Sequence, residues 1–117
     1  MDRTSQKLIK IFGTKAEIVK AISEFSELSA ALSEYIYCLE TDNEAQAVST
    51  LDEVFEELGD ARLTLNTLAH IFGTGNFQKA LKESIEKANS AIRLKEAETL
   101  AMERHSRYAK GKVREGY

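Results

Sequence analysis

The chain has 117 residues and a net charge of -3, a size that fits one compact domain. It contains no proline and a single cysteine, Cys38, so no proline interrupts its helices and an intrachain disulfide is excluded. No stretch approaches the ~20 apolar residues of a membrane span and no signal peptide opens the chain, so the expected location is the cytoplasm.

The charge is unevenly distributed along the chain. Residues 15–60 hold two bases and twelve acids, whereas residues 100–117 hold five bases and two acids. Nucleic acids are bound mainly through their phosphates, which an acidic surface repels. We therefore expect no nucleic-acid partner and no membrane partner, and consider the acidic region a candidate binder of divalent cations.

The first half of the chain is expected to form two helices. Residues 1–12 are predicted to be a short leading helix. Thr14 and Glu17 fit a capping box, so a longer helix should begin there. Its apolar residues recur at helical spacing: Ile18, Ile22, Phe25, Leu32, Ile36 and Leu39. The side chains of residues 41–43 compete with the helical backbone for hydrogen bonds and predict a turn.

A second long helix should return antiparallel to the first, because the turn is short. Its apolar stripe comprises Leu51, Val54, Phe55, Leu58, Ala61, Leu65, Leu68 and Phe72. Gly73 and Gly75 should stop it, and Asn76 should cap a third long helix. The residues of that helix expected to face inward are Phe77, Leu81, Ile85, Ala88 and Ile92. The predicted fold is all-α, an antiparallel helical hairpin plus a third long helix. It forms one domain, 1–117, with a core at about residues 8–95 and a projecting or flexible basic tail at 96–117.

Four acidic residues form two matching motifs. Glu24 and Glu27 make an E-x-x-E in the first long helix, and Glu57 and Asp60 make an E-x-x-D in the second. Residues three apart share a helix face. The turn at Asp42 lies midway in sequence between Glu24 and Asp60, and also between Glu27 and Glu57. An antiparallel hairpin with matching offsets should therefore bring all four carboxylates to one level and one side.

Converging carboxylates repel one another unless a cation lies among them. Oxygen ligands suit the hard ions Mg²⁺ and Mn²⁺, and Mg²⁺ commonly shares its coordination with substrate phosphates. Glu24, Glu27, Glu57 and Asp60 are therefore the predicted metal ligands. A di-iron site would need Glu-x-x-His motifs on facing helices, and the sequence has none.

The segments Ile22–Leu28 (ISEFSEL) and Val54–Asp60 (VFEELGD) resemble the two metal-binding helices of the MazG-like all-α nucleotide pyrophosphohydrolases. The likeness extends over roughly residues 8–75 and is greatest for the small single-domain bacterial and phage members. It implies Mg²⁺-dependent cleavage of a nucleoside triphosphate, NTP or dNTP, between its α- and β-phosphates, giving a monophosphate and pyrophosphate. It also implies an assembly of hairpins from two or more chains. Ser23 stands where the family often has a further glutamate.

Further residues are candidates for the same reaction. Glu53 and Glu56 flank the second motif; either is a candidate to polarise the attacking water, and the alternative is that both are solvated surface residues. Binding of phosphate needs cations or amide donors, and Lys82, Asn89 and Arg93 on one flank of the third helix are the candidates; the alternative is that this flank is a solvated face.

Apolar residues outside the two stripes leave more apolar surface than one hairpin can cover. These residues include Val19, Tyr37, Leu63 and Ile71. A homodimer or homotetramer is therefore predicted. The alternative to an enzyme is a non-catalytic helical interaction or regulatory module derived from the same fold.

Overall fold

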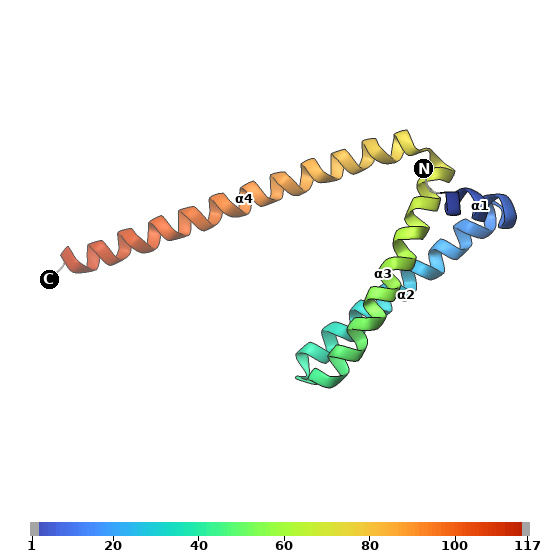
Figure 1. Ribbon diagram of the computed structural model, residues 1–117. Helices are drawn as coiled ribbons and strands as arrows, with labels where there is room; N and C mark the ends of the chain where they lie inside the picture. Colours follow the sequence, from blue (N-terminus) through green and yellow to red (C-terminus); the bar gives the residue numbers. More distant parts are fainter. Residues whose placement is uncertain (1–2, 116–117) are drawn as a thin grey trace. The chain divides into compact units, whose positions relative to one another are not determined.

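The computed structural model describes residues 3–115, and the surroundings of individual side chains for residues 3–109. This described range contains four α-helices and no strand (Figure 1): α1 Arg3–Phe12, α2 Thr14–Glu40, α3 Glu44–Phe72 and α4 Thr74–Glu115. The prediction of an all-α fold is thereby confirmed. Two residues of the predicted leading helix, Met1 and Asp2, lie outside the described residues.

None of the described helices combines the length and the apolar character that a membrane span requires.

Two glycines mark the breaks between consecutive helices. Gly13 separates α1 from α2 with a φ of 88°, and Gly73 separates α3 from α4 with a φ of 107°. Glycine adopts such positive φ angles without a steric penalty, so the chain can turn there within a single residue. The backbone N–H of Gly13 donates to the Ile9 carbonyl (2.8 Å), and that of Gly73 donates to the Ala69 carbonyl (2.9 Å).

The starts of α2 and α4 differ from the sequence prediction. Thr14 is the first helical residue of α2 and Gly13 is its N-cap, with no side-chain hydrogen bond, so the predicted capping box is wrong. Helix α4 begins at Thr74, which places both Gly75 and Asn76 inside its first turn. In both places the glycine before the helix makes the turn, and a capping side chain is not required.

Helices α2 and α3 form the predicted antiparallel hairpin, joined by residues 41–43 (Figure 1). Asp42 adopts a φ of 54° in the turn. Asn43 caps α3, because its side-chain oxygen accepts a hydrogen bond from the backbone N–H of Gln46 (3.2 Å). The prediction of a turn from these three residues is confirmed.

The two hairpin helices meet along a seam of small side chains. The buried seam residues are Ala21, Ala31 and Cys38 from α2, with Ala47, Thr50, Val54, Ala61 and Thr64 from α3. In α3 they recur at intervals of three, four and seven residues, and in α2 at ten and seven, which are spacings of one contact line in a coiled coil. Helix α1 packs against both α2 and α3, and the Thr67 hydroxyl of α3 donates to Ser5 Oγ of α1 (3.0 Å). Thr50 and Ser5 are the largest fully buried side chains of the described range, so this core is made of small residues.

Most large apolar residues of the two predicted stripes lie outside the seam, although Val54 and Ala61 of the second stripe are buried in it, so the expectation that the stripes pack on each other holds only in part. The exposed residues, here called the apolar face, are Ile22, Phe25, Leu32, Ile36 and Leu39 of α2 with Phe55, Leu58, Leu65 and Phe72 of α3. Two helices can bury only one line of contact between them, and here that line uses the small residues next to each stripe. Small side chains allow the two backbones to approach closely, and the larger ones remain on the surface.

The chain divides into two compact units, residues 1–74 and residues 75–117. Within the described residues the second unit is helix α4 from Gly75 onward, and this 42-residue helix continues through the basic segment as far as Glu115. Of the side chains expected to face inward, Leu81, Ile85, Ala88 and Ile92 are exposed and Phe77 is half-buried. The last two residues of the predicted tail, Gly116 and Tyr117, lie outside the described residues.

Candidate metal centre

The acidic motifs lie at the middle of the hairpin. Glu24 occupies a seam position on α2 and Glu57 occupies one on α3, so both side chains are half-buried between the helices. Asp60 follows Glu57 by one helical turn and is exposed at the edge of the seam. The seam had been expected at the neighbouring apolar stripes, about 100° further round each helix. The shift of the contact line is what moves Glu24 and Glu57 from the flank of the hairpin into its interior.

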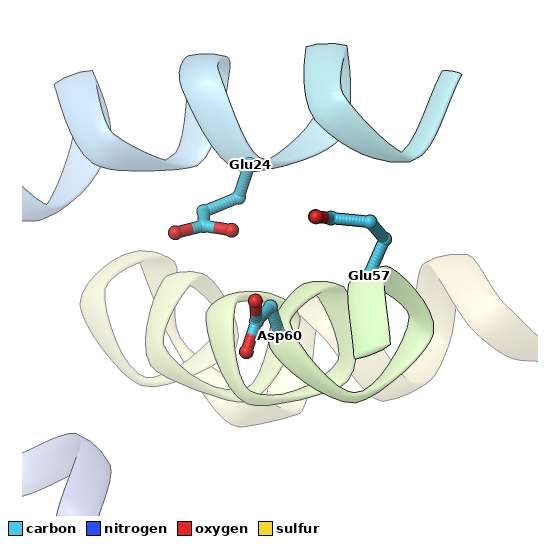
Figure 2. A group of neighbouring side chains, drawn as sticks. All are labelled: Glu24, Glu57 and Asp60. Atoms are coloured by element: carbon cyan, nitrogen blue, oxygen red, sulfur yellow. The ribbon is translucent and has the colours of Figure 1, made fainter. Parts of the chain in front are cut away.

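The structure brings three of the four predicted ligands together. Glu24, Glu57 and Asp60 each offer one carboxylate oxygen, and these three oxygens all lie within 4.8 Å of one another. Figure 2 shows Glu24 reaching from α2 towards Glu57 and Asp60 of α3. The antiparallel register explains the meeting, because residues equidistant from the turn at Asp42 face each other across the hairpin.

The buried oxygens of this cluster fit a cation. Glu24 Oε2 and Glu57 Oε2 are shielded from solvent and make no hydrogen bond among the described residues. A buried polar atom without a partner is unfavourable by roughly 1–3 kcal/mol, more if the group is charged. A cation placed among these oxygens would satisfy them, and carboxylate oxygens are the ligands that Mg²⁺ and Mn²⁺ prefer.

The electrostatics of the cluster are those of crowded negative charges. Burial raises the pKa of Glu24 above its ordinary value of 4.5, and the negative charges of Glu27 and Asp60 raise it further, against the opposing effect of Lys20. Burial also raises the pKa of Glu57, followed by the charges of Glu27, Asp60 and Glu24. The metal-free hairpin is therefore destabilised by its own carboxylates when they are ionised.

This crowding predicts an unusual pH dependence of stability. A carboxyl whose pKa is raised by folding stabilises the folded state when protonated, below its unfolded value of 4.5, and that contribution is lost as the pH rises through the raised pKa. The thermal midpoint of the metal-free protein is therefore expected to rise when the pH is lowered from about 7 to about 5. With saturating Mg²⁺ the thermal midpoint should instead fall when the pH is lowered, because protons then compete with the ion for the carboxylates.

Thermal melts followed by circular dichroism at several pH values would measure how the midpoint changes with pH. One series is run in chelator and one in Mg²⁺, and each gives one slope of midpoint against pH. Glu57→Gln removes one of the repelling charges, so it should raise the metal-free midpoint near neutral pH and flatten the metal-free slope. Equal slopes with and without Mg²⁺ would contradict the view that the ion and the protons share these carboxylates.

The remaining acidic candidates lie near the cluster but are exposed. Glu27 is outside the group of three, yet its charge raises the pKa of both Glu24 and Glu57, so its carboxylate is close to them. Glu53 and Glu56 are exposed on α3, and neither belongs to the group. A role of Glu53 or Glu56 in activating water stays a prediction.

The predicted phosphate-binding residues lie on α4, in the second unit. Lys82, Asn89 and Arg93 are all exposed, and the Arg93 guanidinium donates to Ser90 Oγ (3.1 Å). Their spacing of seven and four residues places them along one stripe of the helix. Their relation to the carboxylates stays a prediction.

Two residues near the cluster were missed by the sequence analysis. Glu17 is buried and Lys20 is exposed, and both line a small cavity that also borders Glu24 and Asp60. Glu17 precedes Glu24 by seven residues, so helical periodicity could have placed it on the same side of α2. It was assigned instead to a capping box, which the structure does not contain.

Comparison with known proteins adds no relative. No family model matches the chain, and neither the curated proteins nor the solved structures gave a match.

Proposed function

We propose that the chain is a Mg²⁺-dependent nucleoside triphosphate pyrophosphohydrolase of the MazG-like kind, which converts NTP or dNTP into a monophosphate and pyrophosphate. The observation that carries the proposal is the meeting of Glu24, Glu57 and Asp60, with two buried carboxylate oxygens lacking partners. The likeness of residues 22–28 and 54–60 to the metal-binding helices of that family supports the assignment of the reaction.

Each part of the cluster has a role in this proposal. Glu24, Glu57 and Asp60, with Glu27 beside them, would hold Mg²⁺ or Mn²⁺. The bound ion supplies charge neutralisation for the triphosphate and activation of a water molecule. The two packed helices fix the carboxylates in place, and phosphoryl transfer depends mostly on such positioning and on electrostatic stabilisation. Glu53 or Glu56 would accept a proton from the attacking water, and Lys82, Asn89 and Arg93 would bind the phosphates.

The direct test is release of pyrophosphate from nucleoside triphosphates in Mg²⁺ and in chelator. A panel of standard and modified triphosphates is needed, because a metal held by the carboxylates would bind the phosphates and would not select a base or sugar. Pyrophosphate formed only with the metal supports the enzyme. Absence of turnover across the panel would favour the alternative, a helical interaction module.

Self-association is the second part of the proposal, and it rests on the apolar face. Phe25 follows Glu24, and Leu58 follows Glu57, by ~100° in the same rotational sense, which places both on one side of the antiparallel pair. Glu27 and Asp60 lie ~60° from the seam in the opposite sense, on the other side. Two copies joined through their apolar faces would form a homodimer, or pair again into a homotetramer, and leave the carboxylates open to substrate.

Metal binding should also be visible without turnover. An ion that binds only the folded state stabilises it by ~2.7 kcal/mol at a concentration 100 times its dissociation constant. The thermal midpoint near neutral pH is therefore expected to rise by several degrees between chelator and millimolar Mg²⁺, as followed by circular dichroism. Ca²⁺ at the same concentration tests whether the site prefers Mg²⁺, the smaller ion. An unchanged midpoint in Mg²⁺ would contradict the metal site.

A further inference from the structure

A small cavity opens in the hairpin on the α1 side of the carboxylates. Its volume is about 40 Å³, which is room for a few water molecules. It is lined by Leu8, Glu17, Lys20, Glu24, Asp60, Leu63, Thr64 and Thr67. A second cavity, of about 140 Å³, is lined by Phe12, Ala16, Glu17 and Lys20. Glu17 and Lys20 border both cavities, so the two spaces adjoin at these residues.

Lys20 is the one base that lines either of these two cavities. The acidic region from residue 15 to residue 60 has a single other base, Lys15, which lines neither of them. The charge of Lys20 lowers the pKa of Glu24, so the ammonium group lies close enough to act on a member of the metal cluster. Lys20 is also exposed, so a ligand in solution can reach it.

A triphosphate approaching this region meets mostly negative charge. Bound cations neutralise part of the charge of the substrate, and the remaining phosphate oxygens need donors from the protein. An ammonium group is a compact point charge with three donors, which suits it to this task. The location of Lys20 beside Glu24 would put such a donor next to phosphates held at the carboxylates.

We propose that Lys20 is a substrate-binding residue that donates to a phosphate group of the triphosphate at the junction of the two cavities. The inference rests on the proposed function, because phosphates are drawn to this region only by the metal. It gives the reaction a phosphate donor on α2, in the same unit as the carboxylates and in addition to the predicted donors of α4.

The experiment compares Lys20→Met with Lys15→Met, which removes the same charge from the same helix outside the cavities. Calorimetry would measure the binding of Mg²⁺ alone, and then of inorganic pyrophosphate in saturating Mg²⁺. Lys20→Met should weaken pyrophosphate binding by about tenfold or more relative to Lys15→Met, the size expected for a hydrogen bond to a charged group. It should leave Mg²⁺ binding equal or tighter, because a positive charge beside Glu24 is removed. Lys20→Arg should recover most of the pyrophosphate affinity.

The outcomes separate this inference from the proposed function. Equal pyrophosphate affinity in the two Met variants would overturn the role of Lys20, even if the parent hydrolyses triphosphates. Weakening of both Mg²⁺ and pyrophosphate in Lys20→Met would also overturn it, since that pattern indicates a structural role. A parent protein that binds no pyrophosphate in Mg²⁺ and releases none from triphosphates would overturn both proposals.

Discussion

Glu57→Gln and Asp60→Asn are each expected to reduce Mg²⁺-dependent pyrophosphate release by at least ~100-fold, since loss of a group that merely supports a metal ligand already costs ~10–100-fold. Both substitutions preserve size and remove one charged carboxylate from the group of three. The helical circular dichroism should be retained, because the substitutions also relieve repulsion among the carboxylates. The measurement is turnover at saturating substrate and Mg²⁺, together with the affinity for Mg²⁺.

Two exposed acids provide matched controls. Glu34→Gln on α2 and Asp52→Asn on α3 make the same chemical change on the same helices, away from the cluster. Both should keep the activity of the parent. If Glu57→Gln and Asp60→Asn hydrolyse triphosphates as well as these controls do, the metal has been assigned to the wrong face of the hairpin.

The double substitution Ile36→Lys and Phe55→Lys is expected to dissociate the assembly into a 13.1 kDa particle. The two side chains are 52% and 63% exposed in the single chain, so lysine there disturbs the seam little. In an assembly closed through the apolar face they would be buried, and each large apolar side chain contributes ~1.5–3 kcal/mol when fully buried. Self-association should weaken by at least ~100-fold, and the thermal midpoint should fall with it.

Light scattering and sedimentation would measure the mass of the particle. Thermal melts at matched protein concentration would measure the midpoint. Ser33→Lys is the control, because Ser33 is an exposed polar residue of α2 and does not belong to the apolar face. It should keep both the mass and the midpoint of the parent. A parent that is already a 13.1 kDa particle would refute the proposed self-association.

The hairpin and the meeting of its carboxylates could be predicted because they depend on local and periodic features. Residues 41–43 specify a short turn, and a short turn permits only an antiparallel return. Once the turn is fixed, the register follows from counting residues, and Glu24 has to face the region of Asp60. The level at which the carboxylates meet does not depend on which line of side chains forms the contact, whereas their depth between the two helices does.

The contact line itself could not be read from hydrophobic periodicity. The large residues of the stripes, such as Phe25 and Leu58, give the strongest periodic signal, whereas Ala31 and Thr64 of the true seam give almost none. A stripe of large apolar residues indicates which face is to be buried, but not whether the same chain buries it. The helix starts were mispredicted for a related reason, because Gly13 and Gly73 make the turns where capping side chains were expected.

The seam of alanine and threonine also affects how the folding of the chain depends on protein concentration. Ordering one residue in a helix loses ~1–2 kcal/mol of backbone entropy, and burial of an alanine returns little of it. In the proposed assembly the hairpin therefore depends on a second copy for most of its stabilisation. Local contacts across a short turn form rapidly, so the slow step would be the encounter of two chains. Folding would then be second order, and the folded fraction would depend on the amount of protein present as well as on temperature.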